Sequence, residues 1–371
     1  MKIVADDRIP FLRGVLENFA EVVYLPGAET TPADVADADA LIVRTRTKCN
    51  TGLLQHSRVR CVATATIGFD HIDVPAMEKL GILWSNAPGC NARSVRDYIA
   101  SAFAASGCDL RGKTLGVVGV GNVGKLVAQV GEAFGMNVLL NDPPRAEKEG
   151  SAGFTALDEL LALADVVTLH VPLDVSGKYP TLNMADREFF AKMRPGAWFF
   201  NSCRGEAVDT AAFLEAKNSG RIAFSLMDVW RGEPAIAPEL LNAVEIGTPH
   251  IAGYSVDGKA NGTSAAVRFV AQTLGIAELT GFKVTELPLP VYSSEIIIPS
   301  GVSPYEALRY AVLHAYDIRC DADALRNAPQ DFELLRGKYW KRREFSAYTV
   351  CNAPEEALKS LQLLEFKIKQ R

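Results

Sequence analysis

Three closely spaced glycines constrain the fold of this 371-residue chain more than any other feature. Gly119, Gly121 and Gly124 form G-x-G-x-x-G within "GVVGVGNVGKLVAQVGEAFGMNVLLND", between an apolar run and an amphipathic one. The first glycine permits a tight turn, the second lets a pyrophosphate approach the backbone, and the third lets a helix pack closely on the preceding strand. The motif therefore predicts a strand, a turn and a helix whose N-terminus holds a dinucleotide.

An acid follows the glycine motif at the end of the next predicted strand. Asp142 lies 18 residues after Gly124, where a carboxylate accepts hydrogen bonds from ribose hydroxyls and repels a 2′-phosphate. This position favours NAD over NADP. Arg145 keeps NADP open, because a nearby arginine accommodates the 2′-phosphate. The alternative to a nucleotide site is a purely structural glycine turn.

Short β-type runs alternate with helical patterns through most of the chain. In the first hundred residues, the expected strands are 2–6, 22–25, 40–43, 60–65 and 82–84, and the expected helices include 10–19 and 73–80. A second series begins at residue 114, with helical patterns at 157–164, 186–193 and 208–218. This alternation predicts an α/β fold with two doubly wound parallel-sheet domains of the Rossmann or flavodoxin-like type. Residues 91–107 and 257–278 are expected to form long helices that join them.

The texture changes after about residue 282, where "ELPLPVYSSEIIIPSG" introduces several prolines. The remaining segment mixes strand-like runs with helical patterns at 304–316 and 354–363, which predicts a third, smaller α+β domain. It also contains the basic cluster "KYWKRR" at 338–343, which suits either an exposed surface or an interface between subunits.

Composition excludes several classes of protein. A formal net charge of −5 argues against a nucleic-acid partner. Seven scattered cysteines without a C-x-x-C motif indicate reduced thiols in a cytoplasmic protein, with neither a disulfide framework nor a metal site. No apolar run approaches the roughly 18 residues that a membrane span requires, so no membrane partner is expected.

Chemistry-bearing side chains follow three buried strands of the second series. "AWFFNSCRGEAVD" presents Arg204, "SLMDVWRGEP" presents Asp228 and Glu233, and "VEIGTPHIAGY" presents His250. At the carboxyl ends of parallel strands these groups share one edge of the sheet. Such a set suits hydride transfer with a nicotinamide.

Each of the three groups has a specific chemical role on that hypothesis. Arg204 holds a substrate carboxylate through a bidentate pair, and His250 takes the proton of the C2 hydroxyl as general base. Glu233 binds the far side of the imidazole, fixing its tautomer and tuning its basicity. Taken singly, each residue also suits a purely structural role, and His71 in "FDHID" is the next candidate for the base.

These motifs resemble the D-isomer-specific 2-hydroxyacid dehydrogenases over about the first 280 residues: "GVGNVG", "NSCRGEAVD", "MDVWRGEP" and "TPHIAGY" occur in the order of that family. The resemblance implies that Arg204, Glu233 and His250 are the catalytic residues. It also implies a discontinuous substrate-binding domain (1–90 and 257–282) and an NAD-binding Rossmann domain (91–256), with the active site in the cleft. A C-terminal dimerisation domain (286–371) follows.

Finer features resemble the branch of that family that oxidises 4-phospho-D-erythronate to its 2-oxo acid in pyridoxal phosphate biosynthesis. They include "TATIGFDHID", "SNAPGCNA" and "LRGKYWKRREFSAYTV", and they extend the resemblance over nearly the whole chain. This branch implies a homodimer formed by the tail domain. The implied substrate residues are Thr45, Thr66 and Tyr254. The implied NAD-site residues are Gly119, Gly121, Asn122, Val123, Gly124, Asp142, Val171, Ser202, Cys203, Arg204, Asp228 and Gly253.

The residues also favour a doubly anionic substrate independently of the resemblance. Arg44, Arg46 and Lys48 follow a predicted strand at a period of two, so an extended chain would place them on one side. There Arg44 and Arg46 are expected to bind a substrate phosphate, the alternative being a solvated basic edge. Departures from the family pattern include Val171, where a threonine is usual, and Asp97, where a glutamate is common.

Other functions remain open at this level. A sibling dehydrogenase acting on 3-phosphoglycerate or on glyoxylate and hydroxypyruvate shares the same catalytic set. An NAD-sensing corepressor-like binding protein uses the same scaffold without turnover, and a hydrolase or methyltransferase can be built on a similar sheet.

Overall fold

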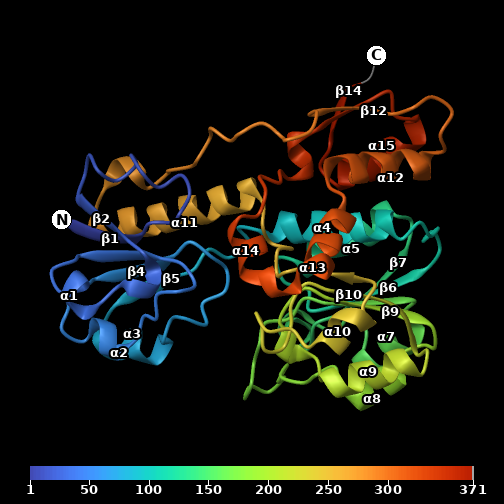
Figure 1. Ribbon diagram of the computed structural model, residues 1–371, viewed down its shortest axis with the longest axis horizontal. Helices are drawn as coiled ribbons and strands as arrows, with labels where there is room; N and C mark the ends of the chain where they lie inside the picture. Colours follow the sequence, from blue (N-terminus) through green and yellow to red (C-terminus); the bar gives the residue numbers. More distant parts are fainter. Residues whose placement is uncertain (370–371) are drawn as a thin grey trace. The chain divides into compact units, whose positions relative to one another are not determined.

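The computed structural model describes residues 1–369 of the chain. These residues form two compact units, each discontinuous in sequence: Met1–Asn91 with Ser255–Pro288, and Ala92–Tyr254 with the chain from Leu289 onward. The predicted division into three functional domains stays a prediction. Two parallel α/β sheets and a small C-terminal sheet are present, which confirms the predicted fold class (Figure 1).

The first unit is built on a five-stranded parallel sheet with the order β2-β1-β3-β4-β5. Its strands are β1 (Lys2–Asp6), β2 (Glu21–Leu25), β3 (Ala40–Val43), β4 (Cys61–Thr64) and β5 (Leu83–Ser85). Its helices are α1 (Pro32–Val35), α2 (Thr51–Leu54), α3 (Val74–Leu80) and α11 (Val256–Leu274). The buried face of α11 covers one side of the sheet, and residues of the three short helices pack on the other.

The helix predicted at 10–19 does not form. Residues 7–20 instead make a series of turns between β1 and β2, in which Phe11 (φ 62°) and Gly14 (φ 84°) adopt left-handed conformations. Leu12 and Leu16 are nevertheless fully buried beneath this loop. The apolar spacing therefore correctly predicted which residues are buried. It did not predict the conformation, because Gly14 inside the pattern allows the chain to turn rather than continue as a helix.

The second unit contains a six-stranded parallel sheet with the order β11-β10-β9-β8-β6-β7. Its strands are β6 (Thr114–Val118), β7 (Asn137–Asn141), β8 (Val166–Leu169), β9 (Ala197–Asn201), β10 (Ile222–Met227) and β11 (Ile246–Gly247). The helices of this part are α4 (Ala92–Ala105), α5 (Gly124–Ala133), α6 (Pro143–Glu149), α7 (Leu157–Leu163), α8 (Arg187–Lys192), α9 (Thr210–Asn218) and α10 (Pro238–Ala243). The strand order reverses at β6, which is where ligands bind in sheets of this kind.

The C-terminal segment adds a three-stranded parallel sheet to the second unit. Its strands, in the order β12-β13-β14, are Glu295–Ile297, Thr349–Cys351 and Lys367–Lys369. Its helices are α12 (Pro304–Ala315), α13 (Ile318–Asn327), α14 (Phe332–Gly337) and α15 (Leu358–Leu363). We call this segment, from residue 289 onward, the tail domain. The long helices predicted at 91–107 and 257–278 are confirmed by α4 and α11.

The tail domain and the six-stranded sheet share one hydrophobic core. Helices α12 and α15 pack beside α4 and α5 in Figure 1, and the buried cluster between them runs from Val95 to Phe366. Phe103 joins the two parts of this cluster through Phe134, whose ring meets Tyr305 edge-on. In the part of the chain that the structure describes, no helix is long and apolar enough to cross a membrane.

This shared core predicts how the second unit unfolds. Phe345 is fully buried and its ring stacks on Phe366 at 4.6 Å. Phe345→Ala should therefore lower the free energy of unfolding by about 3–5 kcal/mol, as deleting a buried aromatic ring does. Urea unfolding followed by circular dichroism measures it, with the half-exposed Tyr310→Ala as the matched control in the same domain. A loss in Phe345→Ala no larger than in the control would contradict the shared core.

Candidate active site

The glycine turn between β6 and α5 has the geometry that a dinucleotide requires. A Cβ on Gly119, whose φ is 87°, would lie 2.6 Å from the carbonyl oxygen of His170, and one on Gly124 would lie 1.9 Å from that of Gly119. A Cβ on Gly121 would meet nothing within 4 Å. The first and third glycines are thus needed for the fold itself, whereas the second leaves open space over the backbone. Asn122 and Val123 complete the turn, and α5 begins after Val123 without a side-chain cap.

Asp142 follows β7 and ties the end of that strand to the glycine turn. Its Oδ2 accepts a hydrogen bond from the backbone N–H of Val120 (2.8 Å), and its Oδ1 accepts one from that of Arg145 (3.1 Å). A carboxylate accepts about four hydrogen bonds, so lone pairs remain for ribose hydroxyls. The guanidinium of Arg145 is engaged by Glu149 (2.7 Å) and by the carbonyl oxygen of Val120. Arg145 is therefore already paired, which favours NAD over NADP.

Glu233 and His250 meet beyond the ends of β10 and β11. The Oε1 of Glu233 lies 2.5 Å from His250 Nδ1, and its Oε2 accepts from the backbone N–H of Trp230 at 3.3 Å. Burial raises the pKa of Glu233, but the hydrogen bond and charge of His250, with a smaller effect from Arg336, outweigh it and lower the pKa overall. An ionised carboxylate on Nδ1 fixes the proton there, so Nε2 of a neutral His250 is the nitrogen that accepts a proton.

The loop that carries His250 is held by a buried carboxylate. Asp228 Oδ1 accepts from the hydroxyl of Thr248 (2.6 Å) and from the backbone N–H of Ile251 (2.7 Å), and Oδ2 accepts from that of Ala252 (2.8 Å). Burial raises the pKa of Asp228, although these hydrogen bonds and the charge of His250 oppose the rise. His250 itself has a φ of 56°, a left-handed conformation that the loop must impose.

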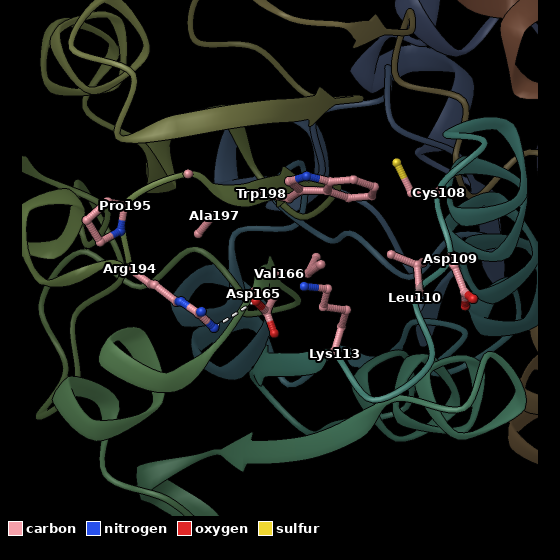
Figure 2. A pocket seen from close by; sticks show the side chains of 11 residues that line it. Cys108, Asp109, Leu110, Lys113, Asp165, Val166, Arg194, Pro195, Ala197 and Trp198 are labelled. Carbon is pink, nitrogen blue, oxygen red and sulfur yellow. Dashed lines mark hydrogen bonds and ion pairs between the residues drawn. The ribbon is translucent and has the colours of Figure 1, made fainter.

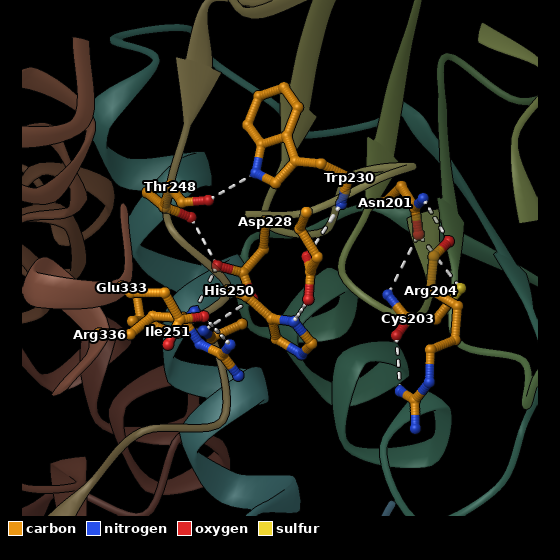
Figure 3. A network of polar contacts seen from close by, with 12 residues as sticks. Asn201, Cys203, Arg204, Asp228, Trp230, Thr248, His250, Ile251, Glu333 and Arg336 are labelled. Carbon is orange, nitrogen blue, oxygen red and sulfur yellow. Dashed lines mark hydrogen bonds and ion pairs between the residues drawn. The ribbon is translucent and has the colours of Figure 1, made fainter. Parts of the chain in front are cut away.

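Arg204 is brought to the same region by close backbone packing. It follows β9, and its Nη1 donates to the carbonyl oxygen of Cys203 at 2.8 Å. A Cβ on the next residue, Gly205, would lie 2.1 Å from the carbonyl carbon of Trp230, so only glycine lets this segment lie against the one that leads to Glu233. Figure 3 shows Arg204 on one side of His250 within this polar network.

Three further residues of the predicted NAD site line the same edge of the sheet. A side-chain carbon of Val171 would lie 2.9 Å from a Cβ on Gly119, which places Val171 against the glycine turn. Ser202 Oγ is buried, and within residues 1–369 it has no hydrogen-bond partner. Cys203 is buried, which raises the pKa of its thiol. The open space at Gly121 and the unpartnered hydroxyl of Ser202 fit a polar cofactor bound along this edge.

The tail domain holds the other side of the loop that carries His250. Arg342 is fully buried, and its Nη2 donates to the carbonyl oxygen of Ala252 (2.6 Å) and to that of Ser94 (3.3 Å). Its guanidinium stacks 4.4 Å from the centre of the Tyr316 ring. One member of the basic cluster at 338–343 is therefore neither a surface nor an interface residue, but a support for the loop of His250.

Known families match two separate segments of this chain. Residues 90–252 match the NAD-binding domain of the D-isomer specific 2-hydroxyacid dehydrogenases. Residues 289–364 match a family described only as a domain of unknown function. A curated erythronate-4-phosphate dehydrogenase of Bacteroides fragilis is 46% identical over 94% of this chain and 99% of its own length. One from Shigella flexneri is 40% identical over 95% of this chain and 94% of its own length.

The chain belongs to the D-isomer specific 2-hydroxyacid dehydrogenase family. This confirms the resemblance seen in the sequence and the expectation of an NAD-dependent dehydrogenase. Among solved structures, D-lactate dehydrogenase of Aquifex aeolicus, complexed with NAD and lactic acid, is 26% identical with a TM-score of 0.64. It covers 78% of this chain and all of its own.

The predicted substrate residues of this dehydrogenase do not all follow the expected pattern. Residues 44–48 turn immediately after β3, so the argument that an extended chain places Arg44, Arg46 and Lys48 on one side is wrong. The Thr47 side chain within this turn is buried and donates to the carbonyl oxygen of Gly27, which bends the backbone away from a strand. The binding roles proposed for Arg44 and Arg46 stay predictions.

The remaining substrate candidates lie in different surroundings. Thr66 shares a hydrogen bond with Thr64 (2.8 Å) and donates to the carbonyl oxygen of Gly68, while Thr45 is exposed in the turn after β3. Tyr254 closes the turn after His250 that contains Gly253, with its backbone N–H donating to Ile251. His71, the alternative base, is bonded to Thr64, and burial lowers its pKa. It lies in the first unit and does not belong to the Glu233–His250 pair.

A pocket of the second unit lies at the opposite edge of the sheet from the candidate catalytic residues. The hollow, of about 230 Å³, is lined by residues at the amino ends of β6, β8 and β9. Figure 2 shows Lys113 and Trp198 beside it, with Arg194 paired to Asp165 at 2.8 Å. Parallel sheets of this type bind ligands at the carboxyl ends of their strands, so this hollow is separate from the proposed chemistry.

The glycine turn supplies a test that separates binding from folding. Gly121→Ala should fold normally, since its Cβ meets nothing, yet bind NADH at least about tenfold more weakly because the methyl occupies the space of the pyrophosphate. Gly124→Ala should instead lower the melting temperature, because its Cβ collides with the carbonyl oxygen of Gly119. NADH fluorescence titration and thermal unfolding measure the two effects. Unchanged affinity in a folded Gly121→Ala variant would refute the cofactor placement.

Proposed function

We propose that this protein oxidises 4-phospho-D-erythronate to 2-oxo-3-hydroxy-4-phosphobutanoate with NAD, within the biosynthesis of pyridoxal 5′-phosphate. The observation that carries the proposal is the extent of the similarity. Curated relatives that match 94–95% of this chain are erythronate-4-phosphate dehydrogenases. The solved lactate, glyoxylate and 3-phosphoglycerate enzymes match 78% of it at 24–26% identity. The assignment to 4-phospho-D-erythronate therefore depends partly on the tail domain, because the matches to erythronate-4-phosphate dehydrogenases cover more of the chain than the matches to the other enzymes.

The geometry supports a division of labour among three side chains. Arg204 forms a planar, bidentate pair with the substrate carboxylate and orients the C2 carbon. The Nε2 of His250 accepts the proton of the C2 hydroxyl, and Glu233 stabilises the imidazolium that results. The turn of Gly119 to Gly124 and Asp142 would hold NAD, whose nicotinamide would supply the hydride acceptor for C2.

The second candidate function is oxidation or reduction of another 2-hydroxy acid. The same three catalytic groups serve any substrate with a carboxylate beside the reacting carbon, and related structures include a 3-phosphoglycerate dehydrogenase of Entamoeba histolytica. Groups that bind the distal end of the substrate decide between these acids. The NAD-sensing alternative is not favoured. A protein that only binds NAD does not need the Glu233–His250 pair near Arg204, whereas a dehydrogenase uses such a set for proton transfer and for binding the substrate carboxylate.

One assay separates the candidates. The wild-type protein should reduce NAD with 4-phosphoerythronate at a kcat/KM at least about tenfold above that with 3-phosphoglycerate, glycerate or lactate, which corresponds to about 1.4 kcal/mol. His250→Asn should lower kcat by about 10²–10⁴-fold while NADH still binds, because only the general base is lost. Faster turnover of another acid would overturn the substrate assignment, and full activity in His250→Asn would overturn the role of His250.

We also propose that the protein is a cytoplasmic homodimer formed through the tail domain. Leu289, Val291, Tyr292 and Ile297 are large apolar residues that are 59–81% exposed, and all lie on or just before β12. β12 is an edge of the three-stranded sheet, and an exposed apolar edge favours pairing with another chain. The buried free thiols of Cys49, Cys61 and Cys203 suit a reducing compartment.

The proposed dimer predicts the effect of a charge on this edge. Ile297→Asp should convert the protein to monomers in sedimentation velocity, since an aspartate at the centre of an apolar interface is left without a partner. Leu163→Asp, on a half-exposed residue of α7, is the control and should leave the dimer intact. A monomeric wild type, or a dimer that persists in Ile297→Asp, would contradict the proposal.

A further inference from the structure

Arg336 belongs to the tail domain, yet its side chain lies among the catalytic residues. It occupies the last turn of α14, and its guanidinium carbon is 5.8 Å from the centre of the Tyr254 ring and 5.9 Å from that of Phe332. Tyr254 comes four residues after His250 in the same loop. In Figure 3, Glu333 and Arg336 enter the polar network from the tail domain and approach His250.

The charge of Arg336 is only partly matched by its neighbours. Its ion pair with Glu333 is long, with 3.4 Å between Nη1 and Oε1, and Tyr254 is a further hydrogen-bond partner of the side chain. The Nε is buried, and within the described residues it has no hydrogen-bond partner. Glu233, the remaining acid nearby, is occupied by His250 at 2.5 Å. A largely buried guanidinium with an unmet donor and one long ion pair is suited to receive another anion.

The position of Arg336 relative to Arg204 defines which anion that is. Figure 3 shows the two guanidinium groups on opposite sides of the His250 ring. If Arg204 binds the carboxylate and the C2 hydroxyl faces His250, the rest of the substrate extends away from Arg204. The group at the far end of the proposed substrate is a phosphate.

We propose that Arg336 is a substrate-binding residue that pairs with the phosphate at the end of the substrate remote from the carboxylate. This inference rests on the proposed function, and it assigns to the tail domain a part in substrate specificity. The planar fork of the guanidinium suits two phosphate oxygens, and the phosphate replaces Glu333 as the closer anion. The carboxylate clamp and the phosphate clamp then lie on either side of the base.

The test compares phosphorylated and unphosphorylated acids in variants of Arg336. Arg336→Met keeps an unbranched stem against Tyr254 and Phe332 but removes the charge. It should lower kcat/KM for 4-phosphoerythronate about 10- to 100-fold more than that for erythronate, as expected for loss of a charge-assisted pair. Arg336→Lys should recover part of the loss, since the charge returns without the fork.

Controls distinguish this role from a structural one. Arg319→Met removes an exposed arginine of the same domain, paired with Asp317, and should leave both substrates unaffected. NADH titration should be unchanged in all variants. Equal losses on both acids in Arg336→Met would mean that Arg336 acts by positioning Glu233 or Tyr254, and no loss on either would mean no role; both results overturn the proposal.

A second pair of substrates separates this inference from the proposed function. The same variants are assayed with 3-phosphoglycerate and glycerate. If the wild type prefers 3-phosphoglycerate over 4-phosphoerythronate, the substrate assignment fails. A selective loss on the phosphorylated member in Arg336→Met would still support the phosphate clamp, and an equal loss on both members would refute it independently.

Discussion

The backbone of Ala252 is the point on which the arrangement of the candidate active site depends. Its N–H donates to the buried carboxylate of Asp228, and its carbonyl oxygen accepts from the buried guanidinium of Arg342. Hydrogen bonds to charged groups contribute about 1.5–3 kcal/mol each, enough to hold the left-handed backbone of His250 two residues earlier. With that backbone fixed, the imidazole meets Glu233 in one orientation, and the acceptor nitrogen faces away from the carboxylate.

This clamp connects the tail domain to the candidate active site. Arg342 and the proposed phosphate ligand Arg336 both belong to it, and its helices share a core with α4 and α5. Asp97 contributes to the same junction, accepting the backbone N–H of Phe345 at 2.9 Å, and burial raises its pKa to about 6. A change that loosens the tail domain is therefore expected to reach the loop of His250 as well as the core.

The three glycines of the G-x-G-x-x-G motif are required for different physical reasons. Gly119 and Gly124 are fixed by contacts within the chain, because an added Cβ would lie 2.6 and 1.9 Å from neighbouring carbonyl oxygens. Gly121 has no such neighbour, so the fold does not require a glycine there, whereas the proposed NAD site does. Contacts within the chain also bear on the choice between NAD and NADP. Glu149 already pairs with the guanidinium of Arg145, which would otherwise be available to bind the 2′-phosphate of NADP.

The sequence by itself determined the parallel α/β architecture, the glycine turn and the placement of the three candidate catalytic side chains at strand ends, because these depend on local periodicity, glycine spacing and the edge that parallel strands share. It misled at residues 10–19 and 44–48, where turns replaced a helix and an extended segment. Only the tertiary structure decided that Arg342 is buried beneath the loop of His250 and that Arg336 lies beside it. No local pattern distinguishes a buried arginine from an exposed one, since its surroundings come from segments about 90 residues away in the chain.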